Sequence, residues 1–219
     1  MFNMFNEKNT FCINLDRRPD RWAKMQSIFT KTNLSVTRWT ASLPKDVTDR
    51  ITGSPTQQAC AQSHIRIWKH MLKNDIPYAL ILEDDVTFDK EWRQKLEKIG
   101  SDTEIALLML NTNHQYGDIE NWVPTRGESW LTGAYVLTKK TAHALLDAGM
   151  RNGFLPSDWM LIQYQKASEN RGCYSYFPYL AIQTSLDSDI AGSLPETSYR
   201  EVVEQLSSIS YDLSNYITP

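Results

Sequence analysis

Cysteine is scarce in this sequence of 219 residues, which has only Cys12, Cys60 and Cys173. Their number is odd and no two of them form a C-x-x-C pair, so neither a disulfide framework nor a zinc ribbon is expected. Small buried thiols in a reducing compartment are the simpler explanation.

Long apolar runs and basic stretches are missing too. No run reaches the roughly 20 apolar residues that a membrane-spanning helix needs, and the apolar stretch at the amino terminus is too short for a signal peptide. The formal net charge is -3, with scattered lysine and arginine, which argues against nucleic-acid binding. We therefore expect a soluble, cytoplasmic protein. Peripheral membrane contact is compatible with this sequence, which leaves the oligomeric state open.

The most distinctive stretch is residues 78–86, an apolar run that ends in three carboxylates. Side chains alternate along a strand, so Glu83 and Asp85 should share one side while Asp84 takes the other. Acids at the carboxyl end of a buried strand lie where open α/β sheets bind ligands. A divalent cation such as Mg²⁺ or Mn²⁺ would relieve their repulsion. An acidic turn after a core strand explains the triplet equally well.

The rest of the chain alternates between strand and helix patterns, which predicts a mostly parallel sheet flanked by helices. Strands are expected at 10–15, 36–41, 78–86, 105–110, 130–137, 174–177 and 179–183. Helices are expected from Pro19, from Pro55 to 72, after a cap at Asp89, from 139 to 148 before Gly149, from a cap at Ser157 or Asp158, and around 199–209. Residues 111–127 lack periodicity and are expected to form a long surface loop.

Three arginines, Arg17, Arg18 and Arg21, cluster where the first strand passes into a helix. Guanidinium groups and a helix amino terminus together are suited to binding phosphate. The alternative is a solvated helix start, in which these arginines pair with Asp16 and Asp20.

Polar or small residues interrupt two other apolar elements. Ser63 and His64 lie within the second predicted helix, where a lone histidine is more often a structural residue than a ligand. Gly133 lies inside the predicted strand 130–137. Glycine weakens a strand, so we expect another backbone or a ligand to approach closely there.

Six blocks of the sequence together resemble glycosyltransferase family 25, which includes bacterial lipooligosaccharide galactosyltransferases and collagen hydroxylysine galactosyltransferases. The blocks follow the family's order and are INLDRRPDR at 13–21, CAQSHIRIW at 60–68, ILEDDV at 81–86, GAYVL at 133–137, SDW at 157–159 and SDI at 188–190. Two features depart from the family: Ala59 stands where glycine is common, and residues 44–53 carry little of the usual pattern, which leaves the nucleotide base without an assigned contact.

The resemblance implies a GT-A-type, Rossmann-like α/β fold in a single domain spanning 1–219. Its catalytic core would cover about 10–192, and a small C-terminal annex of helix and tail would cover 193–219. The resemblance also implies a UDP-sugar donor, Mn²⁺ or Mg²⁺, inversion at the sugar carbon, and a glycan or hydroxylated protein as acceptor, as in lipopolysaccharide biosynthesis.

Site residues follow from the same resemblance. Asp85 is expected to bind the metal directly, with Asp189 as the opposing ligand, and Glu83 to lie nearer the ribose. Inversion needs a base opposite the diphosphate, and we expect Asp158 to supply it, a helix cap being the alternative. Donor binding is expected at Asn14, Leu15, Arg17, Arg21, Ser63, His64, Glu83, Asp84 and Gly133. The rival functions are a metal-dependent phosphoester hydrolase and a catalytically silent sugar-nucleotide-binding protein.

Overall fold

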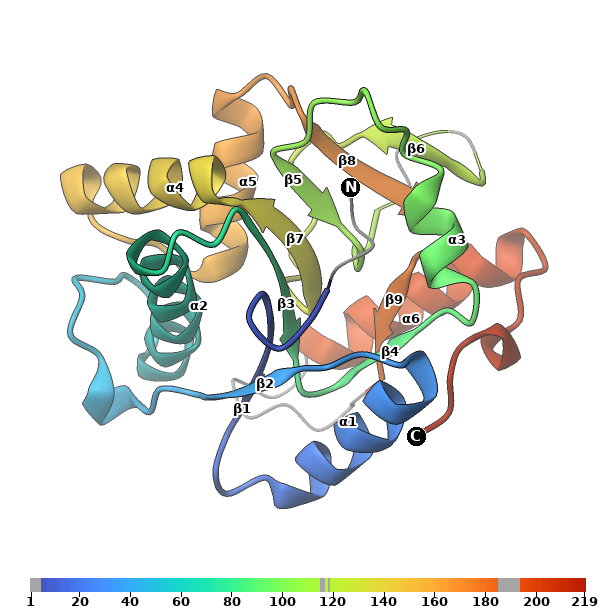
Figure 1. Cartoon of the computed structure of the whole chain (residues 1–219), viewed down its shortest axis with the longest axis horizontal. Coiled ribbons are helices and arrows are strands. Elements are labelled where there is room, and N and C mark those ends of the chain that lie inside the picture. The colour runs from blue at the N-terminus through green and yellow to red at the C-terminus, as the bar shows by residue number, and fades with distance from the viewer. Residues whose placement is uncertain (1–4, 115–116, 118, 185–193) are drawn as a thin grey trace.

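A seven-stranded sheet lies between two groups of helices in the computed structural model of the chain (Figure 1). The structure describes residues 5–114, 117, 119–184 and 194–219, with only the backbone for 194–198. In spatial order the strands are β2 (Thr37–Thr40), β1 (Thr10–Asn14), β3 (Tyr78–Glu83), β7 (Ala134–Thr138), β5 (Leu107–Met109), β8 (Cys173–Phe177) and β6 (Asn121–Pro124).

Most strands of this sheet run in one direction. β1 is parallel to β2 and β3, and β5 is parallel to β8. β7 is antiparallel to both β3 and β5, and β6 is antiparallel to β8. Strands β1, β2, β3, β5 and β8 therefore point the same way, and their carboxyl ends meet at one edge. The expected α/β class with a mostly parallel, helix-flanked sheet is confirmed.

Each face of the sheet is covered by its own group of helices (Figure 1). One face packs against α2 (Pro55–Lys73), α4 (Lys139–Asn152) and α5 (Ser157–Ala167). The other packs against α1 (Pro19–Thr32), α3 (Trp92–Glu97) and a small sheet of β4 (Val86–Phe88) and β9 (Ala181–Gln183). Strands covered on both faces bury almost every side chain, which explains their continuous apolar runs.

Local sequence signals set the starts of the helices that border the site. Ser54 caps α2 by accepting a hydrogen bond from the Gln57 backbone N–H, and the Gln57 side chain accepts one from the Ser54 N–H. This reciprocal capping box, with Pro55 at the first helical position, confirms the predicted start. Helix α1 likewise begins at Pro19 and ends at Asn33, which adopts the left-handed conformation.

Four of the predicted elements are wrong in detail. The strand expected at 78–86 ends at Glu83, and a turn at 84–85 leads into β4. Residues 111–127 include β6, an edge strand in which only Trp122 is buried, so the sequence carries little apolar pattern there. The strand expected at 130–137 begins at Ala134, with Gly133 just before it. Helix α4 continues through Gly149 to Asn152. Glycine is required at position 149 because an added Cβ would lie 2.1 Å from a ring carbon of Phe154.

Asp89 is not the cap of α3, whose first residue is Trp92. Its fully buried carboxylate instead accepts hydrogen bonds from the Glu91 backbone N–H at 2.7 Å and from Lys95 Nζ at 2.7 Å. The hydroxyl of Tyr211 also bonds to Asp89. This cluster fixes the C-terminal segment to α3.

The C-terminal part of the chain packs beside the small sheet. Helix α6 (Leu194–Ser208) and the tail contribute Val202, Leu206 and Tyr216 to a separate apolar cluster with Phe177 and Ile182. The division into a catalytic core and a C-terminal annex stays a prediction. None of the helices in the described ranges combines the length and apolar character that crossing a membrane would demand.

Candidate active site

A cavity of about 650 Å³ opens at the edge where the parallel strands end. Residues just past the ends of β1, β3 and β5 line it, namely Leu15, the acidic triplet and Asn111. Helix α2, the start of α5 and helix α6 provide the remaining walls. A cavity of this size at strand carboxyl ends accommodates a small-molecule ligand.

Glu83 and Asp85 lie on one side and Asp84 on the other, as predicted, although β3 ends at Glu83 and the other two acids lie in the turn that follows. The Gln183 side chain donates from Nε2 to Glu83 Oε2 at 3.2 Å and to Asp85 Oδ1 at 3.1 Å. Both of those carboxylates therefore face the same side of the cavity, whereas Asp84 turns toward helix α1.

Asp84 is engaged with protein groups. Arg21 Nη1 donates to its Oδ1 at 2.9 Å, and Asn14 Nδ2 donates to its Oδ2 at 2.5 Å. The Asn14 amide oxygen in turn accepts from Arg38 Nη2 at 2.6 Å. Burial raises the pKa of Asp84 despite these bonds. A buried ion pair of this kind holds β3 against α1.

The surroundings of Asp85 disfavour its ionised form. Burial raises its pKa to about 7, the charges of Glu83 and Asp84 add to this rise, and Arg21 opposes it. A second charge beside a buried carboxylate has this effect because both cannot ionise cheaply in low dielectric. The carboxylate oxygens of Glu83 and Asp85, which face the same side of the cavity, fit a hard divalent cation such as Mn²⁺ or Mg²⁺. The other predicted metal ligand, Asp189, lies outside the described residues.

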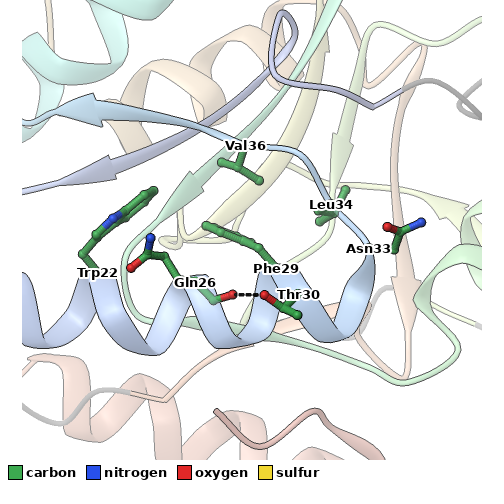
Figure 2. A pocket seen from close by; sticks show the side chains of 7 residues that line it. All are labelled: Trp22, Gln26, Phe29, Thr30, Asn33, Leu34 and Val36. Carbon is green, nitrogen blue, oxygen red and sulfur yellow. Dashed lines mark hydrogen bonds between the residues drawn. The ribbon is translucent and has the colours of Figure 1, made fainter.

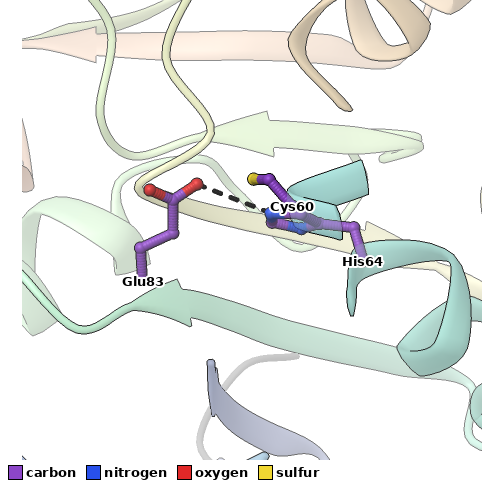
Figure 3. A group of neighbouring side chains, drawn as sticks. All are labelled: Cys60, His64 and Glu83. Atoms are coloured by element: carbon purple, nitrogen blue, oxygen red, sulfur yellow. Dashed lines mark ion pairs between the residues drawn. The ribbon is translucent and has the colours of Figure 1, made fainter. Parts of the chain in front are cut away.

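Glu83 lies at the end of a row of buried polar side chains. Trp68 Nε1 donates to the Tyr135 hydroxyl at 3.2 Å, and that hydroxyl lies 2.8 Å from His64 Nδ1. We assign the Tyr135 proton to His64 Nδ1, which places the imidazole N–H on Nε2, 3.5 Å from Glu83 Oε1 (Figure 3). Although burial opposes it, His64 together with the Thr132 hydroxyl lowers the pKa of Glu83.

Cys60, His64 and Glu83 have ligand-type atoms within 4.8 Å of one another (Figure 3). The tautomer assigned above presents a proton, not a lone pair, from His64 to Glu83. Burial also raises the pKa of the Cys60 thiol, an effect that the Glu83 charge reinforces. A neutral thiol and an N–H are poor metal ligands, so this trio orients Glu83.

The predicted donor-binding residues fall into two groups. Leu15, Arg17, Ser63 and His64 line the cavity together with Arg21 and the acidic triplet. Ser63 also accepts a hydrogen bond from the Ser42 backbone N–H, which fixes residues 41–44 against α2.

Asn14 and Gly133 are not among the residues that line the cavity. Asn14 braces Asp84, as described above. Two side chains, and neither a backbone nor a ligand, make the close approach to Gly133. A Cβ added there would lie 2.6 Å from Gln183 Cγ and 2.7 Å from Asn111 Oδ1.

Asp158 is the second residue of α5 and lines the cavity. The cap position belongs to Pro156, so the cap alternative for Asp158 is wrong. Its carboxylate accepts from the Trp159 backbone N–H at 2.9 Å. Burial raises the pKa of Asp158, and this hydrogen bond limits the rise. A half-buried carboxylate at the cavity wall has the character of a general base.

Sequence reasoning missed several residues of the cavity wall. Asn111 is fully buried, and its amide oxygen and nitrogen have no hydrogen-bond partner within the described part of the chain. Gln183 bridges two acids, and Trp130 and Trp159 expose their rings. These asparagine, glutamine and tryptophan residues are scattered along the chain without a recognisable spacing, so only the fold brings them together.

A second hollow, of about 360 Å³, lies along α1 (Figure 2). Trp22, Phe29, Leu34 and Val36 line it with three uncharged polar residues. Because it has no ionisable side chain, it offers no acid–base or metal chemistry.

Comparisons with known proteins show which family the chain resembles. The family described as "Glycosyltransferase family 25 (LPS biosynthesis protein)" matches residues 7–121, more than half of the chain. A "Glycosyltransferase 25 family member" of Drosophila pseudoobscura pseudoobscura is 29% identical over 180 residues, covering 69% of this chain and 29% of the relative.

Two further relatives have more specific names. "Procollagen galactosyltransferase 2" of Mus musculus is 25% identical, covering 71% of this chain and 30% of the relative. "Lacto-N-neotetraose biosynthesis glycosyltransferase LgtE" of Neisseria meningitidis serogroup B is 24% identical, covering 59% of this chain and 53% of the relative. The chain spans about three tenths of the first two relatives and about half of the third.

Proposed function

The chain belongs to glycosyltransferase family 25, and from that membership we propose that it transfers galactose or glucose from a UDP-sugar to a hydroxyl group of a glycan or hydroxylated protein. One observation carries the proposal: Glu83 and Asp85 face a cavity that Asp158 also lines. Galactose is favoured because one relative is named a galactosyltransferase.

The acidic side of the cavity would hold the leaving group. A divalent cation bound by Asp85, with Glu83 beside it, would take up the negative charge that develops on the departing diphosphate. Arg17, exposed at the cavity, would pair with a phosphate oxygen through its guanidinium group. Arg21 would act indirectly, because it holds Asp84 in place.

Asp158 would serve the opposite side. As the acceptor oxygen bonds to the anomeric carbon and the bond to the diphosphate breaks, the acceptor's hydroxyl proton would pass to the Asp158 carboxylate. Attack from the face opposite the diphosphate inverts the sugar carbon. The raised pKa of Asp158 suits this task because a base is most effective when its pKa approaches the working pH.

The test is to incubate the protein with a panel of nucleotide sugars and Mn²⁺, with and without acceptors, and to measure released UDP. If the protein is a transferase, UDP is released from UDP-galactose or UDP-glucose only when an acceptor is present, and chelation of Mn²⁺ abolishes this release. A hydrolase of phosphoesters would also cleave simple phosphate esters without acceptor. Binding without turnover would indicate a silent sugar-nucleotide-binding protein.

A further inference from the structure

Two tryptophan rings lie exposed at the cavity beside Asp158. Trp130 is 45% exposed and Trp159 is 44% exposed, and both line the cavity. Their ring centroids are 4.6 Å apart with an interplanar angle of 79°. Large aromatic side chains left this open commonly mark a binding surface.

The pair is held in place by its surroundings. The Trp130 backbone N–H donates to Asn113 Oδ1 at 3.3 Å. Asn113 is tied to helix α6 by its own bond to Glu201 Oε2, at 3.0 Å, and by the Gln205 side chain, which donates to the Asn113 carbonyl at 2.8 Å. Trp159 belongs to the first turn of α5. The rings are therefore mounted on ordered elements, which limits the entropy lost on binding.

Polar side chains line the cavity together with the two rings. Asn113, Thr132, Tyr199 and Glu201 line the same cavity. Flat apolar faces bordered by amides, hydroxyls and carboxylates match a sugar ring, which presents apolar C–H groups on its faces and hydroxyl groups at its edge. A lipid chain or an apolar peptide has no hydroxyl groups to offer these polar side chains.

We propose that Trp130 and Trp159 form the acceptor subsite and that its occupant is the terminal sugar ring of a glycan. This inference rests on the proposed function and narrows its acceptor class. The subsite adjoins Asp158, because Trp159 follows Asp158 in the chain and the Trp159 backbone N–H donates to the Asp158 carboxylate. A sugar stacked on one of these rings, with its edge toward the other, would present a hydroxyl to the candidate base.

The test compares the wild-type chain with Trp130→Ala and Trp159→Ala, and with Met150→Ala as the control. Met150 is 69% exposed on α4 and does not line the cavity. Tryptophan fluorescence is titrated with galactose-, glucose- and lactose-terminated oligosaccharides, with a hydroxylysine-containing peptide and with phosphatidylglycerol vesicles. The acceptor KM, UDP affinity and melting temperature are measured alongside.

We expect saccharides, and not the peptide or vesicles, to change the wild-type fluorescence. Either alanine variant should raise the acceptor KM about tenfold or more, with UDP affinity and melting temperature close to wild type. An unchanged acceptor KM, or titration by the peptide or vesicles alone, would overturn the assignment. If the wild type binds saccharides through these rings but releases no UDP from any donor, the subsite stands and the proposed transfer fails.

Discussion

Glu83 and Asp85 share one hydrogen-bond donor, Gln183 Nε2, which lies 3.2 Å and 3.1 Å from their respective carboxylate oxygens. Two acids that converge on a single neutral amide are short of positive charge. Burial raises the pKa of Asp85, and the nearby charge of Glu83 adds to the rise. The predictions on stability and pH follow from this arrangement.

Replacing Asp85 should separate function from stability. We expect Asp85→Asn to lower transfer by roughly 10²-fold or more, the scale seen when a charge-stabilising group is lost. The same change should raise the melting temperature of the metal-free protein at pH 8, because it removes a repelling charge from a buried pair. Asp147→Asn, which removes a partly exposed charge from α4, is the control. A variant that is less stable yet active would remove Asp85 from the site.

The pH dependence of metal binding should follow the same acid. With the pKa of Asp85 at about 7, the carboxylate is mostly protonated below pH 7 and must lose that proton to bind a cation. Mn²⁺ affinity, measured by calorimetry, should therefore fall as the pH drops from 7 to 5 and level off above 8. An affinity independent of pH across that range would contradict this assignment.

Stability of the metal-free protein should change with pH in the opposite sense. Asp85 has a higher pKa when folded than when unfolded, so the folded state binds more protons between the two values. Its contribution makes the protein less stable as pH rises from about 4 to 7 and is constant above that. Denaturant unfolding of wild type and Asp85→Asn should diverge across this window. Curves that stay parallel from pH 4 to 8 would exclude the effect.

Two neighbouring arginines should respond differently to replacement. Arg21→Ala leaves Asp84 buried without its partner and should cost about 3–5 kcal/mol of folding stability. Arg17→Ala should leave the melting temperature nearly unchanged and weaken UDP binding in the presence of Mn²⁺. Equal loss of stability in both variants, or wild-type UDP affinity in Arg17→Ala, would refute this division.

Local sequence pattern predicted that Glu83 and Asp85 lie together, although the turn that follows β3, and not strand alternation, orients Asp84 and Asp85. It also predicted α2, whose capping signals are contiguous in sequence. The pairing of Arg21 with Asp84 spans 63 residues, so an arginine beside a predicted phosphate site was indistinguishable from one that braces the strand.

The remaining errors have similar physical causes. Gly133 was expected to face a backbone or a ligand, but two side chains, Asn111 and Gln183, fill the space above it. Gly149 was expected to end a helix, yet Phe154 packs against it. In both cases the residue that requires the glycine is determined by tertiary packing, which no local pattern encodes.

Asp158→Asn tests most directly whether Asp158 is the general base. The variant is assayed for UDP-sugar binding, Mn²⁺ binding and transfer in one preparation. Asparagine keeps the shape of the side chain but cannot accept the acceptor's proton as a carboxylate does. If Asp158 is the base, we expect wild-type melting temperature and wild-type binding of donor and metal, with transfer reduced at least 10²-fold. Transfer within a few-fold of the wild-type rate would contradict it.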